Sequence, residues 1–264
     1  MDDPLPPLDR AALIEALAAS CVRAGAAILD VYAQDFAVTT KADASPVTAA
    51  DEAAEAILLA DLATAAPGVP VVAEERASAG DVPECGRRFF LVDPLDGTRE
   101  FVSRNGDFTV NVALVEDGAA VVGLVLAPAR GELFVGDVGA GAWRADVADG
   151  TIGARRPIAV RVRAPGGAVA VASRSHRTPE TDAWLAANGI TKTIAVGSSL
   201  KLCLVACGEA DVYPRFGPTM EWDIAAGHAV LSAAGGSVRT PDDATFGYGK
   251  PGFRNADFVA WGAG

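Results

Sequence analysis

Residues 89–98 have the sequence Phe-Phe-Leu-Val-Asp-Pro-Leu-Asp-Gly-Thr, in which an apolar run ends in a turn that holds two carboxylates. The run at 88–92 favours a buried strand, and Asp93 then stands at its carboxyl end, where ligands collect in such sheets. Pro94 constrains the turn, and Asp96 returns to the neighbourhood of Asp93. Two carboxylates this close ionise together readily only when a cation lies between them. The stretch therefore predicts a metal site at the end of this strand.

Gly97 and Thr98 extend the same turn toward an anion site. Glycine lets the backbone approach a ligand closely, and a helical turn that opens at Thr98 would leave amide N–H groups free for an anion. Metal and phosphate would then meet at one loop. The alternative is an ordinary surface turn, because Asp-Gly pairs are common in turns.

Three further acidic positions lie at the ends of expected elements. Glu74-Glu75 follows a short apolar strand, and Asp51 and Asp223 stand near the starts of two helices. Each has a purely structural alternative: a solvated pair, a capping box with Thr48, and an N-cap. Taken together, hard oxygen ligands in this arrangement suit Mg²⁺. Two such ions about 3.5–4 Å apart can hold the attacking and leaving oxygens of a phosphoryl transfer.

The composition limits the classes of function. The chain has 264 residues, of which 50% are hydrophobic, and 22 basic against 34 acidic side chains give a net charge of −12. So much apolar material excludes a disordered chain, and the negative charge disfavours binding to nucleic acid polymers or anionic membranes. An anionic substrate would need a bound cation to invert the local field.

The sequence also indicates a location. Four cysteines without a paired pattern are typical of free thiols in a reducing compartment. The N-terminus has no signal-peptide pattern, and no uninterrupted apolar stretch is long enough for a transmembrane segment. We therefore expect a cytoplasmic protein. Peripheral contact with the cytoplasmic face of the inner membrane and the oligomeric state are left open by the sequence.

The order of expected elements predicts an α+β or α/β fold of two packed lobes. Residues 1–164 would form an N-terminal α+β lobe that holds an antiparallel sheet and the metal loop. Residues 165–264 would form a C-terminal α/β lobe. Two long helices come first, an antiparallel meander follows, and strands then alternate with helices. We expect helices at 9–33, 48–66, 178–188, 198–207 and 223–234. We expect strands at 36–40, 69–73, 88–92, 108–115, 119–127, 132–135, 158–162, 168–172, 194–196, 210–213 and 258–261, with a hairpin within 136–153.

The carboxylate motifs and their surroundings resemble the inositol monophosphatase superfamily, whose members are Mg²⁺-dependent, lithium-sensitive phosphatases. Within it, four segments resemble the CysQ-type 3′(2′),5′-bisphosphate nucleotidases, which act in sulfur metabolism: LVDPLDGTREF at 91–101, RNGDFTVN at 104–111, GSSLKLC at 197–203 and YPRFGP at 213–218. The resemblance extends from about residue 43 to residue 236. It implies a layered αβαβα sandwich of the inositol monophosphatase and fructose-1,6-bisphosphatase type.

The resemblance also implies roles for the acidic residues and the loop. One Mg²⁺ would be held by Glu74, Asp93 and the carbonyl of Leu95, a second by Asp93, Asp96 and Asp223, and a third, weaker ion could share Glu74. The catalytic group would be Asp51, Thr98 and Glu74, with Asp51 and Thr98 orienting or deprotonating the attacking water. The amides of Gly97 and Thr98 would receive the phosphate.

For the rest of the substrate the resemblance implies His176, Ser198, Lys201, Arg215 and Asp223. Cations suit a phosphate that is bound but not cleaved. The implied reaction is hydrolysis of the 3′-phosphate of adenosine 3′,5′-bisphosphate to AMP and phosphate. The alternatives are inositol monophosphate or fructose 1,6-bisphosphate as the substrate, because the metal loop contacts only phosphate, and a non-catalytic module that binds Mg²⁺ and anions. A calcium-stabilised domain is less favoured, because no EF-hand spacing occurs.

Overall fold

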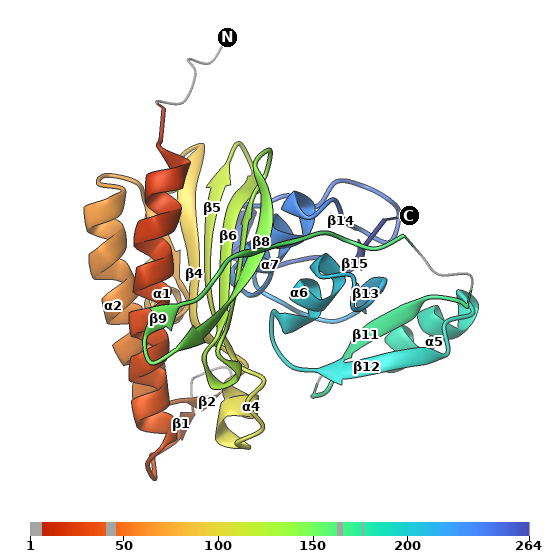
Figure 1. Cartoon of the computed structure of the whole chain (residues 1–264), viewed down its shortest axis with the longest axis horizontal. Coiled ribbons are helices and arrows are strands. Elements are labelled where there is room, and N and C mark those ends of the chain that lie inside the picture. Colours follow the sequence, from red (N-terminus) through yellow and green to blue (C-terminus); the bar gives the residue numbers. More distant parts are fainter. Residues whose placement is uncertain (1–6, 41–45, 163–165, 176, 264) are drawn as a thin grey trace.

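The computed structural model describes residues 7–40, 46–162, 166–175 and 177–263, and it arranges them in five layers. From one outer face to the other, these are helices α1 (Arg10–Tyr32) and α2 (Ala49–Ala65), a large sheet, helices α6 (Leu200–Ala206) and α7 (Glu221–Ala233), a second sheet, and helix α5 (Pro179–Ala187) (Figure 1). This is the αβαβα order that the family resemblance implies.

The two outer helices begin where the sequence places them. The carboxylate of Asp9 accepts a hydrogen bond from the amide of Ala12 at 3.0 Å and caps α1. Thr48 and Asp51 form a capping box at the start of α2. Both helices pack their apolar faces onto each other and onto one side of the large sheet.

Helix α1 is also long and apolar enough to cross a membrane, by length and composition alone. It has 23 residues, and its most apolar window has a mean hydropathy of 1.7. The sequence has no uninterrupted apolar run long enough to cross a membrane, and the prediction that it lacks such a segment rests on that criterion alone. Half of that window is buried inside the fold, and buried core helices and signal sequences share this composition, so it does not by itself assign a membrane span.

The large sheet contains the expected meander. In spatial order its strands are β10 (Arg156–Ile158), β8 (Gly141–Ala148), β7 (Glu132–Asp137), β6 (Ala119–Ala127), β5 (Thr109–Glu116), β4 (Arg88–Asp96) and β3 (Val71–Ala73), with β9 (Thr151–Ile152) paired to β8. All neighbours are antiparallel except β3 and β4. The hairpin expected within 136–153 is therefore confirmed as β8 and β9. A separate small pair joins β1 (Thr39–Thr40) and β2 (Pro46–Val47).

The second sheet carries the strand–helix alternation. Its order is β12 (Lys192–Val196), β11 (Val169–Ser173), β13 (Val212–Arg215), β15 (Phe258–Trp261) and β14 (Ser237–Arg239). Strand β11 is parallel to β12 and β13, whereas β15 is antiparallel to β13 and β14. The predicted lobe boundary between residues 164 and 165 lies outside the described residues.

Several predicted elements differ from the structure. Strand β14 is missing from the prediction. The strand expected at 36–40 is reduced to β1, because its partner β2 pairs with it at two residues only, and the ring of Phe36 packs against Phe101 with centroids 4.7 Å apart. The strand expected at 158–162 ends at Ile158 as β10, and Val162 beyond it is 82% exposed. Helix α6 begins at Leu200 rather than residue 198, because Ser198 has a φ of 47°.

The acidic pair at 74–75 does not simply close a strand, as the sequence suggests. It begins the short helix α3 (Glu74–Ser78). The carboxylate of Glu55 on α2 accepts hydrogen bonds from the amides of Glu75 and Arg76, at 2.9 and 3.2 Å, and so caps α3 from outside the segment. Sequence pattern does not reveal this cap, because the acceptor lies about twenty residues away.

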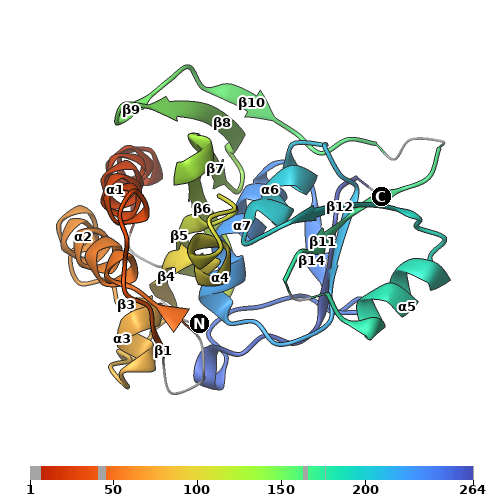
Figure 2. The same ribbon diagram turned by 90° about the horizontal axis from the view of Figure 1, so that it is seen from below.

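Helix α7 fills the space between the two sheets and lies very close to the large one (Figure 2). The contact requires glycine on the sheet. A Cβ at Gly123 of β6 would lie 2.1 Å from the carbonyl oxygen of Ala226, and one at Gly136 of β7 would lie 2.5 Å from Cα of Val230. The two glycines therefore set the depth at which α7 sits.

We expect Gly123→Ala to lower the free energy of unfolding by about 2–3 kcal/mol, because the methyl group would overlap the backbone of α7. Thermal unfolding should show a fall in Tm of several degrees. Gly86→Ala is the matched control, since nothing lies within 4 Å of its Cβ position. Equal Tm values for the two variants would contradict the close contact.

Candidate active site

Strand β4 continues through the motif that was expected to end it at Val92. Its pairing with β5 shifts between Asp93 and Asp96, which marks a bulge. Within this bulge the carboxylate of Asp93 accepts a hydrogen bond from the amide of Leu95 at 3.1 Å. The sheet thereby fixes both carboxylates, and the turn is part of a strand rather than a surface loop.

Gly97 turns the chain from β4 into the short helix α4 (Thr98–Val102), so the helical turn predicted at Thr98 is present. Its φ of 88° lies in the left-handed region that favours glycine. A Cβ here would also lie 3.1 Å from the carbonyl oxygen of Asp107 and 3.3 Å from Cβ of Ser198. Both the conformation and the space therefore require glycine.

Three carboxylates from distant parts of the sequence converge. Oxygen atoms of Glu74 on α3, Asp93 on β4 and Asp223 on α7 lie within 4.8 Å of one another. Burial raises the pKa of Asp93 and of Asp223 well above the usual value, and repulsion from the neighbouring carboxylates adds to both shifts. A divalent cation would relieve this repulsion, and oxygen-only donors suit Mg²⁺. The donor set therefore fits such an ion.

Asp96 lies beside these three carboxylates, on the side of α6. It can accept hydrogen bonds from the hydroxyl of Ser199 at 3.2 Å and the amide nitrogen of Asn111 at 3.5 Å. Burial raises its pKa to about 6, while Lys201 opposes the shift. Ser199 and Asn111 are not among the predicted site residues, although both stand in segments that carry the family resemblance.

Asp51 and Thr98 also face each other. The hydroxyl of Thr98 lies 3.5 Å from Oδ1 of Asp51 and 3.3 Å from the carbonyl oxygen of Leu95. Oδ2 of Asp51 accepts from the amide and the hydroxyl of Thr48, at 2.8 and 2.9 Å. One carboxylate oxygen thus caps α2 and the other faces the site, so the structural and functional interpretations of Asp51 are both compatible with its position.

Asp223, like Asp51, both faces the site and bonds the start of its own helix, but it is not the N-cap that the sequence predicts. It was considered as the N-cap of its helix, but the N-cap is Met220 and Asp223 is the third helical residue. Its Oδ2 accepts from the amide of Met220 at 2.8 Å. The helix begins earlier than expected because Glu221 and Trp222 are buried members of its first turn.

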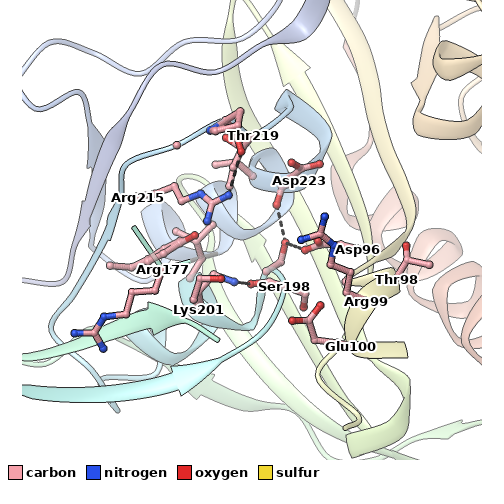
Figure 3. Close-up of a pocket in the computed structure, with 18 of the residues that line it drawn as sticks. Asp96, Thr98, Arg99, Glu100, Arg177, Ser198, Lys201, Arg215, Thr219 and Asp223 are labelled. Carbon is pink, nitrogen blue, oxygen red and sulfur yellow. Dashed lines mark hydrogen bonds between the residues drawn. The ribbon is translucent and has the colours of Figure 1, made fainter. Parts of the chain in front are cut away.

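A cleft of about 510 Å³ opens beside these carboxylates. Asp96, Thr98 and Asp223 lie toward one end, and Lys201 and Arg215 lie across from them (Figure 3). The cleft is therefore acidic on one side and basic on the other, which explains how an acidic protein can accept an anion.

The basic side is built from buried groups. Nζ of Lys201 donates a hydrogen bond to the carbonyl oxygen of Ser198 at 2.5 Å. The guanidinium of Arg215 donates one to the carbonyl oxygen of Pro218 at 3.0 Å. Burial lowers the pKa of Lys201 to about 8, against the opposing effect of Asp96. The Ser198 hydroxyl accepts from Thr109 at 3.0 Å. His176 lies outside the described residues.

Other side chains line the cleft without having been predicted. These are Arg99, Glu100, Ser173, Arg177, Tyr213 and Thr219, among others. Arg99 and Arg177 stand directly next to the predicted residues Thr98 and His176, and the other four lie within four positions of a predicted residue. Closeness in the sequence to a predicted residue is therefore a signal that could have found them.

Comparison with known proteins identifies the family. The model of the inositol monophosphatase family matches residues 9–260. The chain belongs to the inositol monophosphatase family. The resemblance stated from the motifs and the layered fold it implies are both confirmed.

Several members of the inositol monophosphatase family are similar over nearly the whole chain. The 3′(2′),5′-bisphosphate nucleotidase CysQ of Salmonella typhimurium is 45% identical over 239 residues, which cover 88% of this chain and 94% of that protein. The CysQ protein of Escherichia coli K12 is 46% identical over 217 residues, or 81% and 85% of the two chains. The crystal structure of CysQ from Bacteroides thetaiotaomicron has a TM-score of 0.77 at 37% identity, covering 94% and 97%.

We expect Mg²⁺ to raise the Tm of the wild-type protein relative to protein in excess chelator, because a cation that binds only the folded state stabilises it. Asp93→Asn replaces a buried carboxyl group, which is unfavourable to ionise beside its neighbours, with a neutral amide. It should raise the Tm in chelator and reduce the gain that Mg²⁺ brings. Asp243→Asn, at an 84% exposed side chain, is the control and should leave the Mg²⁺ effect unchanged. An undiminished Mg²⁺ gain in Asp93→Asn would exclude Asp93 as a ligand.

Proposed function

We propose that the protein is a Mg²⁺-dependent phosphatase that removes the 3′-phosphate of adenosine 3′,5′-bisphosphate and releases AMP and phosphate. The observation that carries the proposal is a cleft lined at one side by Asp96 and by Asp223 of the carboxylate cluster, and at the other by buried Lys201 and Arg215. A bisphosphate can span such a cleft, with one phosphate at each side. Similarity to proteins named 3′(2′),5′-bisphosphate nucleotidase supports the substrate class.

The metal ligands in this proposal are the carboxylates already described. Glu74, Asp93 and the carbonyl of Leu95 would hold one ion, Asp93, Asp96 and Asp223 a second, and Glu74 could share a third. When bound, Mg²⁺ would acidify a water molecule and neutralise charge on the phosphate oxygens. The convergence of Glu74, Asp93 and Asp223 within 4.8 Å supports the shared use of Asp93.

Asp51 and Thr98 would handle the proton of the attacking water. Thr98 lies within 3.5 Å of Oδ1 of Asp51, so its hydroxyl can accept from water while it donates to the carboxylate. Glu74 would help to orient the same water. The attacking water would pass its proton by way of the Thr98 hydroxyl to the carboxylate of Asp51. As the water oxygen bonds to phosphorus, the bond to the 3′-oxygen breaks and that oxygen takes up a proton from solvent water.

The chain's own donors would hold the phosphates. The amides of Gly97 and Thr98 open helix α4 and would receive the phosphate that is cleaved. Ser198, Lys201 and Arg215 would bind the 5′-phosphate, and His176 is assigned to the nucleoside from sequence alone. The free state of all four cysteines supports the further proposal of a cytoplasmic location.

The decisive experiment measures phosphate release with Mg²⁺ from adenosine 3′,5′-bisphosphate, inositol 1-phosphate and fructose 1,6-bisphosphate at equal concentrations, with and without lithium. We expect the nucleotide to be strongly preferred and lithium to inhibit. Preference for a sugar or inositol phosphate would keep the metal site and exclude the proposed pocket. No release from any substrate would favour a non-catalytic binding module.

Lys201→Ala should raise KM for adenosine 3′,5′-bisphosphate by about tenfold or more, because a charged hydrogen bond to phosphate contributes about 1.5–3 kcal/mol. Hydrolysis of adenosine 3′-monophosphate, which lacks the 5′-phosphate, should change little. Equal losses on both substrates would remove Lys201 from the 5′-phosphate site.

The same lysine predicts a pH dependence. Because burial lowers the pKa of Lys201 to about 8, its cation is present below that pH and is lost as the pH rises through it. The ratio of kcat/KM for the bisphosphate to that for the 3′-monophosphate should therefore fall above about pH 8. Lys201→Arg should remove this fall, since arginine stays protonated. A ratio that is flat with pH in the wild type would contradict the assignment.

A further inference from the structure

Glu100 is an acidic residue in the wall of a cleft proposed to bind an anion. It lies on α4, two residues after Thr98, and is only 3% exposed, yet it lines the cleft. Figure 3 shows its carboxylate on the side of Ser198. A buried carboxylate is unfavourable unless hydrogen bonds satisfy it. The hydrogen bonds of Glu100 should therefore indicate which donor its carboxylate binds.

Within residues 7–40, 46–162, 166–175 and 177–263, a hydrogen bond reaches one of the two carboxylate oxygens. Oε1 accepts a hydrogen bond from the hydroxyl of Ser175, whereas Oε2 accepts none from any residue the structure describes. The side chain is also held sterically, because a Cβ on Gly197 would lie 2.6 Å from its Cγ. Glu100 is thus fixed in position with one oxygen left for another donor.

The position of the free oxygen limits what that donor can be. Oε2 lies 3.4 Å from the point that a Cβ on Gly97 would occupy, and Gly97 belongs to the proposed seat of the cleaved phosphate. A second phosphate here would be repelled by the carboxylate. The nearest donor that a nucleotide can offer is the ribose hydroxyl on the carbon next to the one that carries the cleaved phosphate.

We propose that Glu100 accepts a hydrogen bond from this neighbouring hydroxyl, and so selects ribonucleotides over deoxyribonucleotides. For a 3′-phosphate the hydroxyl is the 2′-OH, and for a 2′-phosphate it is the 3′-OH. The inference rests on the proposed nucleotidase function. Glu100 is then a specificity-determining residue, and Ser175 is the positioning residue that holds it.

The test compares kcat/KM for adenosine 3′,5′-bisphosphate and for its 2′-deoxy analogue. The wild type should prefer the ribonucleotide by about tenfold or more, as expected for a hydrogen bond to a charged group. In Glu100→Gln the preference should shrink, because the amide oxygen still accepts but carries no charge. In Glu100→Ala it should approach unity.

Two further variants separate recognition from a merely structural role. Ser103→Ala removes a hydroxyl that bonds the backbone carbonyl of Glu100 at 3.2 Å and should leave the preference unchanged. Ser175→Ala should weaken the preference less than Glu100→Ala does. A structural role for Glu100 would lower kcat/KM for both substrates by the same factor.

The outcomes also separate this inference from the function on which it rests. The inference alone is overturned if the wild type hydrolyses both nucleotides without preferring the ribonucleotide. It is also overturned if Glu100→Gln and Glu100→Ala keep the preference of the wild type. If the wild type hydrolyses neither nucleotide, the proposed function fails and this inference falls with it.

Discussion

The packing of helix α7 against the large sheet is the contact on which the site depends. Gly123 and Gly136 let the helix backbone come closer to the strands than any side chain would allow. Because α7 lies between the two sheets, this depth also sets the separation of the layers. It brings Asp223, from the second half of the chain, close to Asp93 on β4, from the first half. The carboxylate cluster is thus a consequence of close packing between distant segments.

The same packing maintains an arrangement that electrostatics opposes. Asp93, Asp96 and Asp223 are buried close to one another, and each has a raised pKa. Several carboxylates in and around this group are also held by hydrogen bonds within the local structure. Asp51 and Asp223 each use one oxygen within a helix-capping arrangement, and Asp93 holds the amide of Leu95. Metal binding and local structure therefore depend on the same side chains.

Charge is distributed across the cleft in a way that can sort the parts of a substrate. The carboxylate side needs a cation before it can accept a phosphate, whereas Lys201 and Arg215 offer positive charge directly. Glu100 lies between these regions and presents a negative oxygen to the cleft. Groups that carry negative charge are thereby directed to two positions, and a neutral donor is favoured between them. Such a pattern selects by the spacing of phosphates and hydroxyls, not only by overall charge.

The long helices, the meander and the residues of the metal loop could be predicted from the sequence, because they depend on local signals: apolar periodicity, capping residues and turn chemistry. The caps by Asp9 and Thr48 are examples. Local signals could not place the start of α3, because its cap comes from Glu55 on another helix. They also could not shorten the strand expected at 36–40, because its length depends on pairing with β2. Which carboxylates meet, and that Glu100 turns into the cleft with one oxygen unbonded among the residues the structure describes, depends instead on the tertiary packing. These facts depend on how closely layers from the two halves of the chain approach, and that distance is set by side-chain volume at contacts far apart in the sequence.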